Sequence, residues 1–341
     1  MTLDLNSLWF VLVGVLLTGY AVLDGFDLGT GALLLTTRDD RERRLMLNAI
    51  GPVWDGNEVW LVTGGGALFA AFPTVYATVF SGFYDAFMLL LAALIVRAVA
   101  IELRSQRPGR AWRAAWDVAF AASSVASALL IGVALGNVVY GIPLDANHEF
   151  QGNLLTLLHP YALFVGLTTV ALLAMHANLY LLLKTDGPLH ARLARLAHVT
   201  VPVYLAAFVG LNAWTLAACP HVAAALRRRP LALGALFVAA VLLAGAILRA
   251  VRRGRAAQAF VASCLSIVTL MLLAGVAIYP TLVFSTPIPE HSLTIYNGSA
   301  TVTSLRFMAM VALLGVPLVL AYTATIYWVF RGKVTLTDES Y

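Results

Sequence analysis

The stretch LWFVLVGVLLTGYAVLDGFDLGTGALLLT at residues 8–36 decides the fold, because it is a long apolar run interrupted by only two charged residues. A lipid bilayer has a hydrocarbon core about 30 Å thick, and a helix of about 20 apolar residues crosses it. This run is longer, so we expect a transmembrane helix that tilts or extends beyond the membrane. It has no small-residue cleavage site, so we do not expect a removable signal peptide.

The composition of the whole chain agrees with a membrane protein. Of its 341 residues, 61% are hydrophobic and 11% are charged, and the mean hydropathy is +0.86. Soluble domains have roughly 45–50% apolar and about 25% charged residues. The net charge of +5 comes from short basic clusters between apolar runs, which is typical of topology signals and not of nucleic-acid binding. Cys219 and Cys264 lie far apart and have no metal-binding spacing.

Applied along the chain, the same length criterion predicts about nine spans. They lie at 8–36, 54–72, 78–102, 114–138, 158–184, 197–218, 231–250, 257–283 and 303–330. We therefore expect an all-α fold, a polytopic membrane helix bundle in which residues 1–341 form a single integral membrane domain. No soluble domain is expected.

Basic residues predict the orientation of this bundle, because cytoplasmic loops carry more Lys and Arg than outer loops. In a nine-span arrangement one side collects Arg38, Arg41, Arg43, Arg44, Arg104, Arg107, Arg110, Arg113, Lys184, Arg192, Arg195, Arg249, Arg252, Arg253, Arg255, Arg331 and Lys333. We take this side as cytoplasmic. The N-terminus is then outside and the C-terminus is in the cytoplasm.

The loops on the opposite side have a different composition. Residues 139–157 and 284–302 are polar and poor in Lys and Arg, so we expect turn-rich surface loops there. One cluster, Arg227–Arg229, also falls on this side against the rule. Either the neighbouring spans are drawn wrongly, or these arginines have a partner on the outer side. Arg306, near the outer start of the last span, is a second unexplained charge.

The first two spans carry four acidic residues. Asp24 and Asp27 are three residues apart, as are Asp55 and Glu58, so each pair lies on one helix face. An ionisable side chain at the centre of a membrane helix costs about 2.5–3.5 kcal/mol, which makes each of these acids a functional candidate. The spans are joined by the short basic segment 38–49, so we expect a ladder of carboxylates that rises from the cytoplasmic surface and passes protons. Alternatively, the acids only hold the helices together by hydrogen bonds.

The third span ends in RAVAIELR, which contains further charges. We interpret Arg104 as an interfacial anchor. Arg97 lies about two turns deeper, where it either extends its side chain to the surface or pairs with Asp27, Asp55 or Glu102.

Glycines in the first two spans predict close helix contacts. Gly25 and Gly29 form a GxxxG motif, which lets a second helix pack closely. We expect a similar role for the tract Gly64–Gly66 in the second span.

The histidines argue against haem ligation by this chain. A bundle that holds two haems needs two facing pairs of histidines at membrane depth. Only His176 lies well inside a predicted span, whereas the others lie in loops or at span ends: His148, His159, His190, His198, His221 and His291. We expect His176 to form a hydrogen bond between helices, and we expect no cofactor-binding or metal-binding residues.

Several segments resemble subunit II of the cytochrome bd-type ubiquinol and menaquinol oxidases, the cyanide-insensitive type included. They are LDGFDLGTG (23–31), RRLMLNAIGPVWDGNEVWLVTGGGALFAAFPTVYATVFSGFY (43–84), RAVAIELR (97–104), IGVALGNVVYGIP (131–143), SLTIYNGSA (292–300) and YTATIYWVFRGKV (322–334). They are distributed over the whole chain, and the first two are long and specific. Residues 184–262 diverge from the family pattern.

The resemblance implies a subunit of a terminal oxidase in the bacterial cytoplasmic (inner) membrane. In this family quinol is oxidised on the outer side and O2 is reduced to water with protons from the cytoplasm, so charge separates without pumping. Two haems b and one haem d are carried by subunit I, often with a small single-helix accessory subunit. Some members also hold a structural quinone. By motif, the family's proton path corresponds to Asp24, Asp27 and Asp55, with Trp54 and Asn57 beside them.

Glu58 is less secure, because relatives can have Gln at its position. The main alternative function is a proton-coupled secondary transporter, which should have broken helices in corresponding positions of two halves. No second acidic pair follows the one in the first two spans, which argues against it. A scaffold without chemistry is the third alternative.

Overall fold

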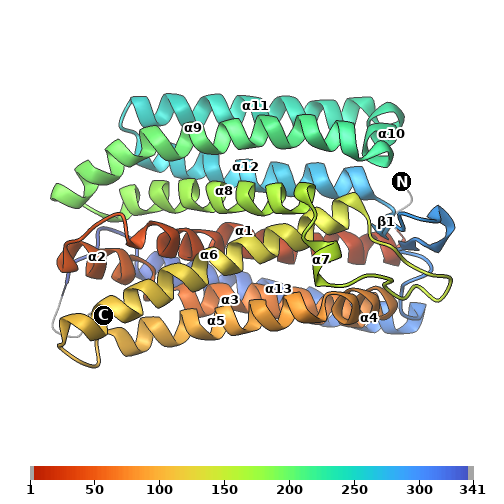
Figure 1. The fold of residues 1–341 in the computed structure, drawn as a ribbon, viewed down its shortest axis with the longest axis horizontal. Helices are drawn as coiled ribbons and strands as arrows, with labels where there is room; N and C mark the ends of the chain where they lie inside the picture. The colour runs from red at the N-terminus through yellow and green to blue at the C-terminus, as the bar shows by residue number, and fades with distance from the viewer. Residues whose placement is uncertain (1–3, 337–341) are drawn as a thin grey trace.

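The computed structural model describes residues 4–336 as a bundle of long, roughly antiparallel helices (Figure 1). The helices are α1 (Leu5–Leu34), α2 (Asp40–Ile50), α3 (Trp54–Ala71), α4 (Pro73–Gly82), α5 (Tyr84–Arg104), α6 (Arg110–Tyr140), α7 (Leu154–Leu157), α8 (Pro160–Lys184), α9 (Gly187–Ala218), α10 (Pro220–Arg228), α11 (Pro230–Arg252), α12 (Ala256–Ile278) and α13 (Val302–Val329). The strands β1 (Thr281–Val283) and β2 (Leu293–Thr294) and a 3-10 turn (Pro289–His291) complete the described part.

Eight helices in the described part are long and apolar enough to cross a membrane. They are α1, α5, α6, α8, α9, α11, α12 and α13. The predicted second span corresponds to α3, whose polar start WDGNE lowers its hydropathy. Helix α3 nevertheless packs along α1. The fold is therefore the expected all-α membrane bundle.

The predicted basic loop at 38–49 is wrong, because most of it forms helix α2. Asp39 caps this helix by accepting hydrogen bonds from the backbone N–H groups of Arg41 and Glu42. The buried side chains Met46 and Ile50 anchor its apolar face to the bundle. The helix cap and the short apolar face are local features, and they do not produce the long apolar run by which a membrane span is predicted.

Three other span boundaries differ from the expectation. The span predicted at 78–102 begins at Tyr84, because Pro73 starts the separate helix α4. Helix α9 begins at Gly187, ten residues before the span expected at 197–218. Helix α12 ends at Ile278, shortly before Pro280, which cannot continue a helix.

The loops predicted at 139–157 and 284–302 lie together at one end of the bundle. The backbone N–H of Ile142 donates to the carbonyl oxygen of Phe284 at 2.9 Å, and that of Thr286 donates to the carbonyl oxygen of Ile142 at 3.1 Å. The antiparallel strands β1 and β2 lie in the same region (Figure 1). These loops are thus irregular, as expected, but hydrogen-bonded to each other.

Helix α1 lies at the centre of the bundle, against α3, α6, α8 and α12. Its residues 24–31 are all buried. The predicted GxxxG contact is confirmed: a Cβ atom at Gly29 would lie 1.9 Å from the carbonyl oxygen of Leu173 in α8, and one at Gly25 would lie 2.9 Å from Leu173 Cδ2. In the Gly64–Gly66 tract, only Gly64 faces a neighbour at close range.

Substitution of Gly29 by Ala should therefore destabilise the protein. The new methyl group meets backbone atoms of α8, which cannot move aside as a flexible side chain can. Overpacking of this kind costs about 1–3 kcal/mol. We expect a clear fall in the midpoint of thermal inactivation for Gly29→Ala. Gly14→Ala is the matched control in the same helix, because its Cβ would have no neighbour within 4 Å. Equal midpoints for the two variants would refute the close contact.

Candidate functional site

A buried ion pair joins α1 to α5. Arg97 donates from Nη1 to Asp24 Oδ2 at 2.8 Å and from Nη2 to Asp24 Oδ1 at 2.6 Å, and both side chains are 0% exposed. The same guanidinium lies 3.0 Å from Glu58 Oε1 in α3. The forked geometry matches the two carboxylate oxygens, which makes this a strong charge-assisted contact. Arg97 thus compensates two acids from two helices.

The predicted partners of Arg97 were wrong. Within residues 4–336, the ion pairs of Arg97 are with Asp24 and Glu58 and not with Asp27 or Asp55, and its fully buried side chain does not reach the surface. Spacing along a helix gives the depth of a residue but not the neighbour that it faces. Glu102 lies on the exposed face of α5, one and a half turns from Arg97.

Asp27 has a different environment. Asn57 donates from Nδ2 to Asp27 Oδ2 at 2.8 Å and to the carbonyl oxygen of Leu23 at 3.1 Å. The hydroxyl of Tyr327 in α13 donates to Asn57 Oδ1 at 2.9 Å. Asp27 Oδ1 is buried and has no hydrogen-bond partner among the described residues. A carboxyl oxygen left without a partner in the interior is free to bind a proton or a water molecule.

The remaining acid of the predicted ladder faces outward. Asp55 is exposed, Glu58 has a side chain that is 25% exposed, and Asp24 and Asp27 are fully buried. The adjacent Trp54 is buried in the core. The structure thus brings Asp24, Asp27 and Glu58 together around Arg97 and Asn57, with Asp55 at the surface of the chain.

A second charge cluster was missed by the sequence interpretation. Asp117 of α6 is buried and accepts from Arg104 Nε at 2.5 Å and from Arg43 Nη1 at 2.8 Å. Asp40 of α2 accepts from Arg104 at 2.7 Å and from Arg113 at 3.0 Å. Arg104 is therefore a buried link between α2, α5 and α6, not the interfacial anchor that we expected. The sequence did contain a signal for this cluster, because Asp117 is an acidic residue inside the predicted span at 114–138.

This cluster predicts an acid-sensitive contribution to stability. Burial alone would raise the pKa of Asp40, but the hydrogen bond from Arg104 and the charges of Arg104 and Arg113 outweigh it and lower that pKa below 3.8. The stabilisation is then fully present above pH 3.8 and is lost as the pH falls through the lowered value. We expect Asp40→Asn to lower the thermal midpoint at pH 7 and to have little effect under strongly acidic conditions. A difference from wild type that is independent of pH would contradict this assignment.

His176 forms the predicted hydrogen bonds between helices. Its Nδ1 lies 2.7 Å from Ser263 Oγ in α12, and its Nε2 lies 2.9 Å from the carbonyl oxygen of Val22 in α1. Both ring nitrogens are therefore engaged, and this residue does not fit an axial haem ligand in the described arrangement. His198 is exposed on α9.

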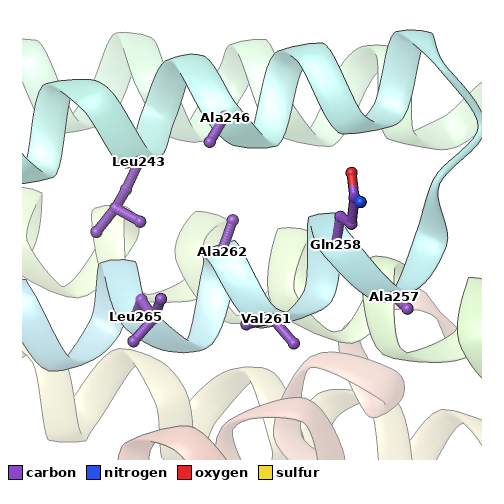
Figure 2. A pocket seen from close by; sticks show the side chains of 7 residues that line it. All are labelled: Leu243, Ala246, Ala257, Gln258, Val261, Ala262 and Leu265. Carbon is purple, nitrogen blue, oxygen red and sulfur yellow. The ribbon is translucent and has the colours of Figure 1, made fainter.

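A groove of about 430 Å³ lies between α11 and α12 (Figure 2). Its walls are Leu243, Ala246, Ala257, Gln258, Val261, Ala262 and Leu265. Gln258 is its single polar side chain, so the groove offers nothing for proton or electron chemistry. The site is instead the packed cluster of acids on α1 and α3.

Comparison with known proteins identifies the family. The profile described as cytochrome bd terminal oxidase subunit II matches residues 5–330. The chain is 37% identical to cytochrome bd-I ubiquinol oxidase subunit 2 of Escherichia coli K12, over 98% of this chain and 96% of that protein. The chain belongs to the cytochrome bd oxidase subunit II family. It is also 32% identical to cytochrome bd ubiquinol oxidase subunit 2 of Bacillus subtilis, over 97% of each protein.

The fold of this chain also resembles that of a solved bd oxidase structure. A solved structure of the bd oxidase from Geobacillus thermodenitrificans matches with a TM-score of 0.80 at 17% identity, over 97% of this chain and 99% of that chain. The chain is therefore a multi-pass protein of the bacterial inner membrane and a subunit of a terminal quinol oxidase, an oxidoreductase. The family implies haem cofactors, a quinol substrate and a partner subunit I. The transporter alternative is not favoured.

Proposed function

We propose that this chain supplies the path by which protons from the cytoplasm reach the site of O2 reduction in subunit I. Asp55 takes up protons at the surface, Glu58 and Asp27 pass them inward, and Asp24 is held in place by its ion pair with Arg97. Asn57 holds Asp27 in position, and Trp54 anchors the start of α3 in the hydrophobic core.

The observation that carries this proposal is the environment of Asp27. Its Oδ1 is buried without a partner, whereas the neighbouring Asp24 is held by a bidentate cation. The two carboxyl groups, three residues apart on α1, therefore have different roles: Asp24 is held in a bidentate ion pair with Arg97, and Asp27 is free to exchange a proton. A purely structural acid would be expected to have both oxygens engaged.

The graded exposure of the acids supports the direction of transfer. Exposure falls from Asp55 through Glu58 to the two acids of α1. Asp55 lies at the start of α3, immediately after α2, and at the same end of the bundle as the C-terminal segment (Figure 1). The basic connections α5–α6, α8–α9 and α11–α12 lie at this end too. This arrangement supports a cytoplasmic location for the acids.

The gathering of basic connections at one end of the bundle also supports a complete membrane topology. We propose that α3 is a ninth span, that the N-terminus is outside and that the C-terminus is in the cytoplasm. Helix α3 runs beside α1 within the bundle, and short polar-tipped helices can cross a membrane when other helices shield their charges. Arg97 provides that shielding for Glu58.

We further propose that two haems b and one haem d are bound by subunit I, not by this chain. The engagement of both ring nitrogens of His176 supports this assignment. The haems supply electron transfer and O2 chemistry, while this chain holds and moves protons. Helix α13, in which Leu305 is the one buried residue, presents an extensive apolar surface to subunit I or to lipid. A small single-helix subunit and a structural quinone complete the proposed complex.

The oxidase assignment can be tested with the purified complex by a reduced-minus-oxidised spectrum and by quinol-driven O2 uptake. We expect a haem d band, and we expect His176→Gln to keep the full haem content per complex, because glutamine retains hydrogen-bonding capacity without providing a haem ligand. Absence of the haem d band from the wild-type complex would contradict the assignment. Loss of one haem from an otherwise assembled His176→Gln complex would move haem ligation into this chain.

A further inference from the structure

The arginines at 227–229 remain unexplained by the oxidase function. Helix α10, which ends at Arg228, lies at the end of the bundle opposite α2 (Figure 1). The other basic clusters lie at the α2 end. Three consecutive cations on the far side oppose the usual distribution of membrane proteins, in which Lys and Arg gather on the cytoplasmic side. The spans on either side, α9 and α11, are well-formed helices, so misdrawn spans do not explain the cluster.

No acidic residue of the described chain neutralises these cations. Arg227 and Arg228 are exposed, and no ion pair involving residues 227–229 occurs within residues 4–336. Arg229 is partly buried. It donates from Nη1 to the carbonyl oxygen of Val276 at 3.0 Å and lies 5.1 Å from the ring centre of Tyr279. These contacts fix its position but do not compensate its charge.

A cavity of about 350 Å³ opens beside this cluster, between α10 and the end of α12. Arg228 and Arg229 line it together with His221, Tyr279, Thr281 and Phe284, and no Asp or Glu is among its lining residues. Its volume lies in the range of small-molecule sites. A concave site with two guanidinium groups and no acid is suited to an anion, and arginine binds phosphate oxygens through two parallel N–H donors.

Exposed apolar residues that follow the lining residues Ala225 and Arg229 in the sequence indicate which anion the cavity takes. Leu226 is 36% exposed and Leu231, at the start of α11, is 88% exposed. A helix with arginines and exposed leucines at the end of a transmembrane bundle lies at the level of the lipid headgroups. A free inorganic anion would gain nothing from these leucines, whereas acyl chains would cover them.

We propose that the cavity between α10 and α12 binds the phosphate headgroup of an anionic phospholipid, with Arg228 and Arg229 as its cationic ligands. The acyl chains run along the exposed start of α11. The site is remote from the acids on α1 and α3, so it does not rest on the proposed proton path.

Native mass spectrometry of the purified complete complex tests this proposal. The complex is exchanged into phosphatidylcholine nanodiscs with or without phosphatidylglycerol and then released into detergent. We expect wild type to retain phosphatidylglycerol and Arg228→Gln to retain about tenfold less, because one charge-assisted hydrogen-bonding partner is lost. Arg227→Gln is the matched control, since Arg227 neighbours the cavity but does not line it. It should retain phosphatidylglycerol as wild type does.

Arg229→Lys provides a second variant that keeps the charge. We expect intermediate retention, because lysine lacks the planar fork of arginine. Equal retention by wild type, Arg227→Gln and Arg228→Gln would overturn the proposal. Displacement of phosphatidylglycerol by an equal concentration of inorganic phosphate would also overturn it, since the site would then recognise a free anion and not a lipid.

Discussion

Replacement of Arg97 by methionine is expected to prevent stable assembly of this subunit. Methionine replaces the aliphatic part of the arginine side chain but carries no charge, so the variant leaves Asp24 fully buried and Glu58 partly buried without their common cation. Removal of one partner from a buried ion pair costs about 3–5 kcal/mol, which is comparable to a large part of the stability of a folded domain. The effect should exceed that of any surface substitution.

The measurement is the yield of assembled complex and its midpoint of thermal inactivation. Arg110→Met is the matched control, because Arg110 is exposed at the start of α6. The double variant Arg97→Met/Asp24→Asn should regain part of the lost stability, since the unpaired acid is removed with the cation. A single Arg97→Met variant that assembles with the wild-type midpoint would show that the ion pair is dispensable.

Neutralisation of the acids in the proposed proton path is expected to slow the oxidase without removing its haems. Asp27→Asn keeps the shape and the hydrogen bond acceptor for Asn57 but cannot bind and release a proton. Positioned acid–base groups typically contribute 10²–10⁴-fold to a rate, so we expect at least about a tenfold fall in quinol-driven O2 uptake. Asp55→Asn should act similarly, although this exposed residue has little structural role.

Haem content per complex must be measured alongside turnover to separate chemistry from assembly. Asp85→Asn provides a matched control, because Asp85 is an exposed acid at the start of α5, at the opposite end from Asp55. Asp55→Glu should restore most of the activity, since it retains a carboxyl group. Wild-type turnover in both Asn variants would show that these acids only hold helices together.

The sequence was sufficient for the fold class. Apolar runs predicted the long helices because a membrane imposes their length, and the GxxxG motif at Gly25 and Gly29 predicted close packing on another helix. The interhelical role of His176 also followed from its isolated position. Its partners, Ser263 and Val22, did not, because nothing in a single sequence relates α12 to α8.

The pairing of charges needed the structure. Arg97 was expected near three acids but contacts two others, since the rotation of α5 about its own axis is set by packing that spacing does not encode. Helix α2 was hidden because a polar segment between two spans resembles a loop. Asp117 was overlooked although its burial makes it the central acceptor of the second charge cluster.

The most direct test of the proposed proton path is the rate of proton uptake when the fully reduced complex reacts with O2, followed with a pH indicator. In the Asp55→Asn complex we predict that the reaction of the haems with O2 begins normally while proton uptake is slowed at least about tenfold, and that Asp55→Glu restores it. Proton uptake at the wild-type rate by a haem-replete Asp55→Asn complex would contradict the assignment of Asp55 as the proton intake of this subunit.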